Sequence, residues 1–317
     1  MMAYIGFDTS NYTTSVAAFF PQEGRVIQNK LLLPVKKGEK GLRQSDAVFH
    51  HTVQLGPVFQ KLSEHEKFTV DGVCASARPC LREDSYMPCF LVGKTAARCA
   101  ALAAGVPFFE TAHQNGHIAA ALFSAGRLDL LEKEFIAFHL SGGTTEALLV
   151  KPDEEEIFLC ERIASSLDLK AGQAVDRAGL MLGLSFPCGK ELDSLACQSK
   201  KRFKVRAPMR GLDCSLSGLE NQCRKMVEAG EAPCDTAKFC IDYISSALDS
   251  MTERILEKYG PLPLVYSGGV MSNSIISKRF KEKYNAIFAK PEFSCDNAAG
   301  VAVIGYLKGK RKAERSF

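Results

Sequence analysis

One pattern, present twice, constrains the fold of this chain more than any other feature. In residues 4–20 an apolar run leads into a cluster of small hydroxyl residues and then into a second apolar run, and residues 135–150 repeat this arrangement around two glycines. Each copy predicts two strands joined by a tight turn whose backbone and hydroxyl groups can face a polar ligand. A hairpin of one type at the head of each half indicates a duplicated fold.

Helices and strands are expected to alternate after each hairpin. The first half predicts a helix at 45–63, a buried strand at 70–76, a helix at 93–104, a strand at 106–109 and a helix from about 112. The second half predicts a helix-rich region at 165–259, a strand at 262–266, and a last helix at 298–307 that ends in a basic tail at 308–315. This alternation is typical of an α/β fold.

Length and composition exclude several classes of protein. The 317 residues suit two lobes with large cores, at roughly 150 residues per domain. A chain that is 46% hydrophobic and 24% charged is not disordered, collagen-like or a coiled coil. No stretch offers the ~18 apolar residues of a membrane span, and the first residues predict a strand without the features of a signal peptide. We therefore expect a cytoplasmic protein without membrane association.

The twelve cysteines are scattered along the chain without a C-x-x-C spacing. That distribution indicates reduced thiols, mostly packed in the core, rather than a disulfide framework. Cys74, Cys99 and Cys240 lie in apolar surroundings and are the clearest candidates for core positions.

The sharpest metal signal is the pair His113 and His117. Residues four apart lie on one face of a helix, so both imidazoles can converge on one cation. A third ligand must come from elsewhere, and Asp296 is the best candidate because it lies between a predicted strand and the start of a helix. The alternative is that the two histidines are only a helix cap and a core contact. The pair is not the H-E-x-x-H of zinc proteases.

Two Ser-Gly-Gly segments follow apolar strands, at 141–143 and 267–269. Missing Cβ atoms there would let backbone N–H groups approach a phosphate or a carboxylate, although each segment alone could be only a turn. Asp176 and Asp193 could accept hydrogen bonds from ribose hydroxyls, with Gly189 allowing a sugar to pass close to the chain. Solvated helix carboxylates are the alternative interpretation.

Basic residues gather at 200–206, at Arg210 and in the tail at 308–315. Clustered cations suit a phosphate backbone, although such runs are also common on solvated surfaces.

Taken in order, these motifs resemble the TsaD family, the tRNA threonylcarbamoyladenosine synthases of the ASKHA (actin-like and sugar-kinase-like) fold. The resemblance implies a duplicated two-lobe α/β fold with a central interlobe cleft. Residues 1–108 plus 297–317 would form the N-terminal lobe and 109–296 the C-terminal lobe with a helical insertion. The signatures that carry it are Asp8-Thr9-Ser10, His113-x-x-x-His117, Ser141-Gly142-Gly143-x-Thr145, Gly172-x-Ala174-x-Asp176, Pro187-x-Gly189, Ser215-x-Ser217-Gly218-Leu219, Gly268-Gly269-Val270-x-x-Asn273 and Asp296-Asn297-Ala298-Ala299.

The resemblance also implies a set of site residues. One divalent metal ion, iron or zinc, would be held by His113, His117 and Asp296. An adenine nucleotide (threonylcarbamoyl-AMP, AMP or ATP) would lie between the lobes. The residues expected to bind it are His139, Leu140, Ser141, Gly142 and Gly143 at the phosphate and acyl region, Asp176, Gly189 and Asp193 at the ribose, and Asn273 beside Gly268 and Gly269. No catalytic group is assigned, and Asp8, Ser10 and Thr13 are candidates in the cleft.

The activity implied is metal-dependent transfer of the threonylcarbamoyl group from threonylcarbamoyl-AMP to N6 of the adenosine next to the anticodon of tRNA. The expected partners are tRNA and TsaB-like and TsaE-like accessory proteins. A metal ion that orients the acyl group, and glycine-loop donors at the phosphate leaving group, suit this chemistry without a covalent nucleophile.

Three segments depart from the family pattern. Asn11-Tyr12-Thr13 stands where the family has a Cys-Asp-Glu stretch, residues 76–86 replace a Gly-Pro-Gly loop, and Thr144 replaces a His. Two alternatives therefore stay open: a divergent paralogue that transfers a carbamoyl-type group to another acceptor, and a non-catalytic nucleotide-binding partner. Protease and sugar-kinase activities are disfavoured, because no general-base Glu follows His113 and the His pair has no obvious role in phosphoryl transfer to a sugar.

Overall fold

The computed structural model describes residues 1–10, 12–34, 42–295 and 297–315. The chain forms two compact units. The first unit comprises Met1–Glu132, Lys151–Cys160 and Cys295–Phe317, and the second comprises Lys133–Val150 and Glu161–Ser294. Residues 109–132, which the sequence analysis assigned to the C-terminal lobe, thus lie in the first unit. Among the described residues, no helix has the length and apolar character needed to cross a bilayer.

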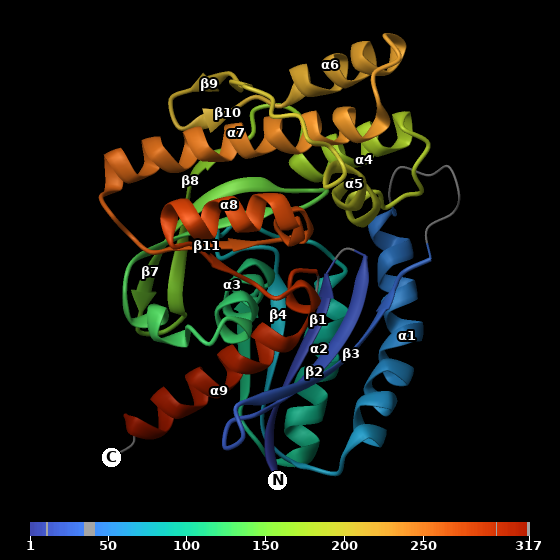
Figure 1. Ribbon diagram of the computed structural model, residues 1–317. Coiled ribbons are helices and arrows are strands. Elements are labelled where there is room, and N and C mark those ends of the chain that lie inside the picture. Colours follow the sequence, from blue (N-terminus) through green and yellow to red (C-terminus); the bar gives the residue numbers. More distant parts are fainter. Residues whose placement is uncertain (11, 35–41, 296, 316–317) are drawn as a thin grey trace. The chain divides into compact units, whose positions relative to one another are not determined.

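The first unit is built on a five-stranded mixed sheet with the order β3-β2-β1-β4-β5 (Figure 1). Strand β2 runs antiparallel to both of its neighbours, β1 and β3. Strands β4 and β5 run parallel to β1. The strands are β1 (Met2–Ser10), β2 (Thr13–Phe20), β3 (Arg25–Leu32), β4 (Thr69–Arg78) and β5 (Phe108–Ala112). The hairpin predicted at 4–20 is therefore present, with a third strand following it.

Helices cover both faces of this sheet. They are α1 (Gln44–His65), α2 (Phe90–Ala104), α3 (His113–Ser124), the short η1 (Leu128–Glu132) and α9 (Ala299–Glu314). Because side chains alternate along a strand, Ile5 and Phe7 join the apolar core under α1 and α2. Gly6 between them faces α9. The strand that leads to Asp8 is thus held from both sides.

The second unit repeats the sheet of the first. Its order is β12-β11-β6-β7-β8, again with an antiparallel hairpin at the centre and two strands parallel to the first hairpin strand. The strands are β6 (Phe135–Leu140), β7 (Thr145–Asp153), β8 (Ile157–Ser165), β11 (Leu264–Ser267) and β12 (Ile287–Phe288). The duplication that the sequence predicted is confirmed in its strand order as well as in its hairpins.

The second unit has additional helices around this sheet. They are α4 (Ala171–Met181), α5 (Gly189–Ala196), α6 (Ser217–Glu228), α7 (Pro233–Tyr259), η2 (Gly269–Ser272), α8 (Ser274–Tyr284) and η3 (Pro291–Phe293). A small ribbon of β9 (Met209–Arg210) and β10 (Asp213–Cys214) lies before α6. Buried side chains of α4, α5, α6 and α7 share one core with β6 and β11.

Several details differ from the sequence expectations. The last helix continues to Glu314, so most of the predicted basic tail is helical, where Lys308 pairs with Glu156 at 2.6 Å. The strand expected at 106–109 is β5, two residues later, and β3 and β8 were missed. Cys99 is exposed on α2, whereas Cys74 and Cys240 are buried as expected; six of the twelve free cysteines are buried.

Candidate functional site

A buried carboxylate ends the central strand of the first unit. Asp8 is 1% exposed, and its Oδ1 accepts a hydrogen bond from the backbone N–H of Ser10 at 2.8 Å. Its Oδ2 lies 2.7 Å from Nδ1 of His113. The turn of the hairpin therefore brings a fixed negative charge to the first residue of α3.

The two histidines predicted as metal ligands converge. Nε2 of His113 and Nε2 of His117 lie 2.9 Å apart, with the rings at 73° to one another. Metal-binding imidazoles commonly donate the other ring N–H to a carboxylate, which fixes the tautomer and the ring orientation. Asp8 occupies this position on His113. The donor set suits a zinc or iron ion, which takes imidazole nitrogens at ~2 Å.

Three glycines bring the surrounding elements together. A Cβ on Gly6 would lie 2.5 Å from the carbonyl oxygen of Ala298, and a Cβ on Gly300 would lie 1.9 Å from the carbonyl oxygen of Gly116. Strand β1 and helices α3 and α9 can therefore approach closely only because these positions lack side chains. Sequence reasoning missed these glycines, since a close backbone contact leaves no signal in a single sequence.

The third predicted ligand, Asp296, lies outside the described residues, as does Asn11 of the first departing segment. The residues that follow Asp296 begin α9, where Oδ1 of Asn297 accepts from the N–H of Ala299 at 3.0 Å. Within the described part of the chain, no group of three His, Cys, Asp or Glu side chains could hold a metal ion. The described residues thus bring together two imidazoles and one carboxylate.

A further imidazole, that of His51, is buried near the hairpin and was not identified from the sequence. Nδ1 of His51 lies 2.8 Å from Oγ1 of Thr14, whose hydroxyl donates to Gln54 at 2.9 Å. Because that hydroxyl proton goes to Gln54, His51 must carry its proton on Nδ1 and leave Nε2 as an acceptor. Burial lowers the pKa of His51 to about 4. Nε2 of His51 and Oγ of Ser10 both lack a hydrogen-bond partner among the described residues.

Thr13, the other cleft candidate, is 5% exposed and begins β2, where it pairs with Ser10 across the hairpin. The three candidates Asp8, Ser10 and Thr13 therefore share one hairpin turn. Of these, Asp8 contacts His113 of the histidine pair directly.

The hairpin turn of the second unit, between β6 and β7, is closed by hydrogen bonds and contains two glycines with open space at their Cβ positions. The N–H of Ser141 donates to the carbonyl of Thr144 at 2.8 Å, and the N–H of Thr144 donates to Oγ of Ser141 at 3.1 Å, which closes the turn. A Cβ on Gly142 or Gly143 would meet no atom within 4 Å, so the outer side of the turn is open. This geometry suits an anion that binds backbone N–H groups.

Two further glycines fit the surrounding chain against that turn. A Cβ on Gly172, in the first turn of α4, would lie 2.6 Å from the backbone nitrogen of Gly142. Gly268 has a φ of 97°, and a Cβ there would lie 2.2 Å from the carbonyl oxygen of Leu140. The N-terminus of α4 and the end of β11 therefore both reach the β6–β7 turn, and a helix N-terminus favours negative charge.

The end of β6 lies beside the end of β11. Nδ1 of His139 lies 3.3 Å from Oγ of Ser267, and Ser267 pairs with His139 in the sheet register. Leu140 is buried and Gly269 has open space at its Cβ position. The residues predicted at the phosphate region thus lie at the C-terminal ends of the neighbouring strands β6 and β11 and in the turns that follow them.

The two carboxylates predicted to bind the ribose, Asp176 and Asp193, both accept hydrogen bonds from the protein itself. Oδ1 of Asp193 accepts from Nδ2 of Asn273 at 2.7 Å, while its Oδ2 accepts from the N–H of Ser274 at 3.1 Å. Asp193 therefore anchors the N-terminus of α8 and has little capacity left for a sugar. Asp176 accepts from the N–H of Cys188 at 2.9 Å through Oδ1 only, and burial raises its pKa. Gly189 begins α5 with open space at its Cβ position.

The carboxylate of Asp168 explains the Ser215-x-Ser217 signature. Oδ1 of Asp168 accepts from the N–H groups of Leu216 at 2.7 Å and Ser217 at 3.2 Å, and Oδ2 accepts from the hydroxyl of Ser215. Although its partial burial acts in the opposite direction, these hydrogen bonds lower the pKa of Asp168. The carboxylate fixes the start of α6, and the sequence analysis did not identify it.

The departing segment at 76–86 lies at the start of α3. The carbonyl of Pro79 accepts from the N–H of Gln114 at 3.0 Å, immediately after His113. Beyond it, Sγ of Cys80 lies 3.3 Å from Oγ of Ser85 and 3.4 Å from Nε of Arg82. Partial burial acts against ionisation, but these hydrogen bonds lower the pKa of Cys80.

Comparison with known proteins gives a family and a fold. The model of the TsaD family, described as tRNA N6-adenosine threonylcarbamoyltransferase, matches residues 32–303. Among solved structures, HypF of T. kodakarensis is 15% identical with a TM-score of 0.59, over 99% of this chain and 48% of that one. Component A of (R)-2-hydroxyglutaryl-CoA dehydratase of Acidaminococcus fermentans is 12% identical with a TM-score of 0.56, over 98% of this chain and 100% of that one. A ROK family glucokinase of Streptomyces griseus is 13% identical with a TM-score of 0.50, over 96% and 99%. These likenesses establish the ASKHA fold class.

Proposed function

Since the chain belongs to the TsaD family, we propose that it transfers the threonylcarbamoyl group from threonylcarbamoyl-AMP to N6 of the adenosine next to the anticodon in tRNA. In this reaction a C–N bond forms between N6 and the carbamoyl carbon. The bond from that carbon to the phosphate oxygen breaks, AMP leaves, and N6 loses a proton. The observation that carries the proposal is the convergence of the His113 and His117 nitrogens beside the buried Asp8.

The proposed metal ligands are His113, His117 and Asp296, with a divalent iron or zinc ion as the cofactor. When bound, such an ion supplies Lewis-acid stabilisation of the charge that develops on the carbamoyl oxygen. Asp8 accepts the Nδ1 proton of His113 and so keeps Nε2 available as a ligand. In this account Asp8 is a positioning residue, and no side chain acts as a covalent nucleophile.

The second unit is proposed to hold the nucleotide. The β6–β7 turn, where the Cβ positions of Gly142 and Gly143 are open, and the N-terminus of α4 suit the phosphate that becomes the leaving group. Further candidates for the phosphate region lie at or just after the C-terminal ends of β6 and β11: His139, Ser141, Gly268 and Gly269. Asp176 and Gly189 remain the proposed ribose contacts, while Asp193 and Asn273 act by fixing the start of α8.

The proposal is tested by a transfer assay with purified protein, threonylcarbamoyl-AMP and unmodified tRNA, with and without TsaB-like and TsaE-like proteins. We expect threonylcarbamoyl-adenosine in the tRNA, lost in His113→Ala and retained in His65→Ala. His65 is an exposed imidazole on α1 and is the matched control. Absence of product under both protein conditions, with AMP binding intact, would contradict the proposal.

A second candidate is transfer of a carbamoyl-type group to a different acceptor. The observation that favours it is the 76–86 segment, which stands where the family has a Gly-Pro-Gly loop and whose Pro79 accepts a hydrogen bond from Gln114, beside the first histidine. Arg82 and the exposed Tyr86 belong to this segment. AMP release from a carbamoyl-adenylate with a small-molecule acceptor, but not with tRNA, would favour this candidate over the first.

Accessory proteins of the TsaB-like and TsaE-like kinds, and a cytoplasmic location, are part of the same proposal. Both follow from a reaction on tRNA. A stimulation of the transfer rate by the accessory proteins, and recovery of the protein with the tRNA-containing fraction of a cell lysate, would support them.

A further inference from the structure

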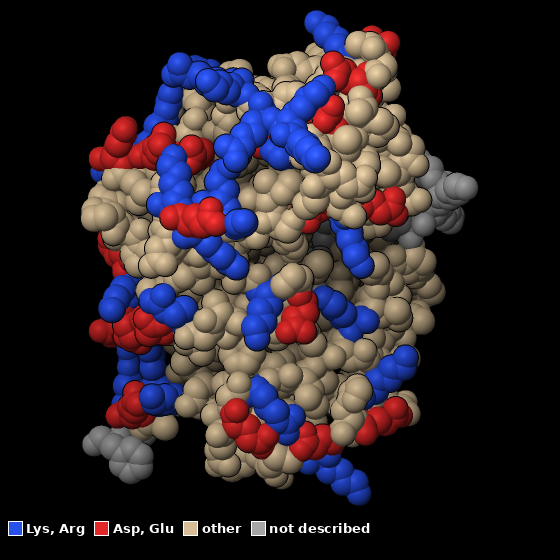
Figure 2. Space-filling model, in the orientation of Figure 1, with Lys and Arg blue, Asp and Glu red and all other residues tan. Residues whose placement is uncertain are grey.

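Exposed cations form a surface on the second unit, which we call the basic surface. It consists of the irregular segment from 200 to 210 and helix α8. Figure 2 shows Lys and Arg side chains gathered over the part of the view where α7 and α8 lie in Figure 1. The exposed members are Lys200, Lys201, Arg202, Lys204, Arg206, Arg210, Lys278, Arg279, Lys281 and Lys283. The segment 200–210 contains no acidic residue, and α8 contains only Glu282.

The 200–210 segment is fastened to α7 by its backbone. The carbonyl of Val205 accepts from the hydroxyl of Ser246 at 2.8 Å, and the N–H of Phe203 donates to Asp242 at 3.4 Å. The ring of Phe203 packs edge-on against Phe239, with the ring centroids 5.5 Å apart. Phe203 and Val205 therefore face the protein, and the cations on alternate positions between and beside them face solvent.

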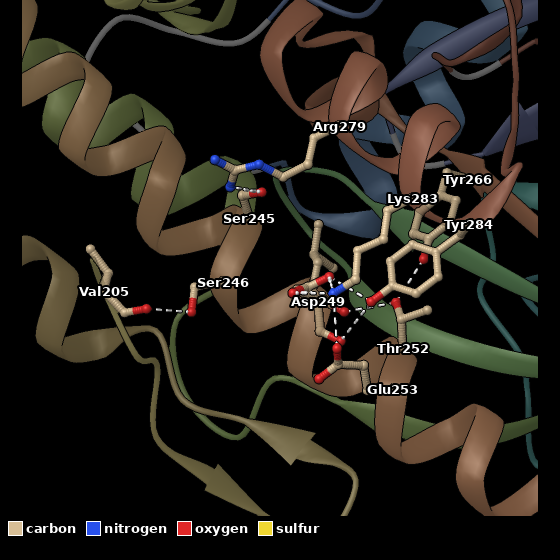
Figure 3. Close-up of polar contacts among 11 residues, drawn as sticks. Val205, Ser245, Ser246, Asp249, Thr252, Glu253, Tyr266, Arg279, Lys283 and Tyr284 are labelled. Atoms are coloured by element: carbon tan, nitrogen blue, oxygen red, sulfur yellow. Dashed lines mark hydrogen bonds and ion pairs between the residues drawn. The ribbon is translucent and has the colours of Figure 1, made fainter. Parts of the chain in front are cut away.

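Helix α8 is fastened to the same helix by its side chains (Figure 3). Arg279 donates to the hydroxyl of Ser245 at 2.7 Å and pairs with Asp242 at 3.3 Å. Lys283 lies 2.8 Å from both carboxylate oxygens of Asp249. The basic segment and the basic helix are thus both attached to α7, which holds the two elements side by side on the second unit.

The cations fall into two groups. Lys201, Arg279 and Lys283 each pair with carboxylates and help to fix the surface. A second group has no carboxylate partner among the residues that the structure describes: Lys200, Arg202, Lys204, Arg206, Arg210, Lys278 and Lys281. These side chains can bind a polyanion without first giving up an ion pair.

We propose that the basic surface is the docking surface for the phosphate backbone of the RNA substrate, an inference that rests on the proposed function. Unpaired cations with few interspersed acids neutralise phosphates and release counterions. No exposed large apolar side chain lies in 200–210 or in α8, so a lipid bilayer would find nothing to bury there. The contacts position the RNA without reading its sequence.

The test measures binding of unmodified tRNA transcript to the full chain over a range of salt concentrations. The variant is R202A/K204A/R206A, and the matched control is K61A/K67A/K133A, which removes the same charge from exposed positions of the other parts of the chain. Three lost phosphate contacts predict an affinity about 100-fold lower at about 0.15 M salt, with a salt slope smaller by about 3. The control should bind as the native chain does, and both variants should keep the native unfolding midpoint and AMP affinity.

The outcomes separate this inference from the proposed function. Native affinity and slope in R202A/K204A/R206A, while the native chain transfers its acyl group to tRNA, would overturn the docking surface and leave the proposed function standing. Absence of both tRNA binding and transfer by the native chain would contradict the proposed function, and the inference with it. If the native chain bound anionic vesicles and R202A/K204A/R206A did not, while both bound tRNA equally well, the basic surface would be assigned to a lipid and the inference would be overturned.

Discussion

The β1–β2 turn of the first unit and the β6–β7 turn of the second join corresponding strands of two sheets with the same order, yet they carry different chemistry. The first turn holds the buried Asp8 and Ser10 against a histidine pair. The second turn has glycines whose side-chain positions are open. The two sheets share a strand order, and their turns present different groups: side chains at the first turn and glycine backbone at the second.

Glycine serves the two units in a similar way away from these turns. Gly300 lets α9 reach α3 in the first unit, and Gly268 lets β11 reach the end of β6 in the second. In both, a missing Cβ brings a second element against the hairpin region. Two kinds of glycine are therefore present. Gly300 and Gly268 permit close packing, whereas Gly142 and Gly143 leave open space beside the turn.

The largest expected effect is on packing. Gly300→Ala places a Cβ 1.9 Å from the carbonyl of Gly116, so α3 and α9 must separate, and we expect a loss of about 3 kcal/mol or more in unfolding free energy. Gly56→Ala is the control, because that helical position has nothing within 4 Å and should be neutral or stabilised by up to about 1 kcal/mol. Denaturant unfolding measures both, and equal stabilities would break the distinction between the two kinds of glycine.

The buried imidazole of His51 in the first unit predicts that stability depends on pH. His51 has its pKa lowered to about 4, so below about pH 6.5 the unfolded chain binds a proton that the folded chain does not. Stability should therefore fall by about 2 kcal/mol between about pH 7.5 and about pH 5 from this group alone. His51→Gln should flatten the unfolding free energy over that range relative to the native chain. His65→Gln, at an exposed site on the same helix, should leave the profile unchanged, and a profile indifferent to His51 would reject the burial account.

The carboxylate at the first turn should matter for metal affinity. Asp8→Asn keeps the shape but removes the charge beside Nδ1 of His113, so we expect affinity for Zn²⁺ to fall about tenfold, or roughly 1.4 kcal/mol. Competition with a chelator measures this, and Asp46→Asn on the exposed first turn of α1 is the control. Unchanged affinity would mean that Asp8 does not position the histidine.

The smallest effect concerns the segment beside α3. Hydrogen bonds lower the pKa of Cys80, so it should be alkylated faster than the exposed Cys99 near neutral pH. Arg82→Ala should slow that reaction a few-fold and move its pH midpoint upward, while Arg98→Ala on α2 should not. Mass spectrometry of the labelled peptides reads out each thiol, and equal rates in all three proteins would contradict the contact.

Much of the fold could be predicted from the sequence, because hairpin patterns and alternating helices are local. The two hairpins, the helices of the first unit and the duplicated topology followed from apolar periodicity and turn residues. The strand β3 was missed because its residues from Arg25 to Leu32 are only partly buried or exposed and show no clear apolar run. The end of α9 was misplaced because its basic residues gain partners, such as Glu156, from a distant part of the chain.

Less of the candidate site could be predicted. The histidine pair follows from helical spacing, which one sequence contains. Its contact with Asp8 joins residues that lie 105 positions apart in the sequence, and the partner of Asp193 lies 80 residues away. His51 and the packing glycines carry no motif at all, since their role exists only once α1, α3 and α9 are in place.

The most direct test of the central claim, that one turn serves a metal and the other a nucleotide, is the binding of Zn²⁺ and AMP to two variants. His113→Ala should lose the metal and keep native AMP affinity. Gly143→Asp has room for its side chain and puts a negative charge at the proposed phosphate site, so it should keep the metal and lose AMP affinity by about tenfold or more. Loss of both ligands in either variant, or native AMP affinity in Gly143→Asp, would contradict the account.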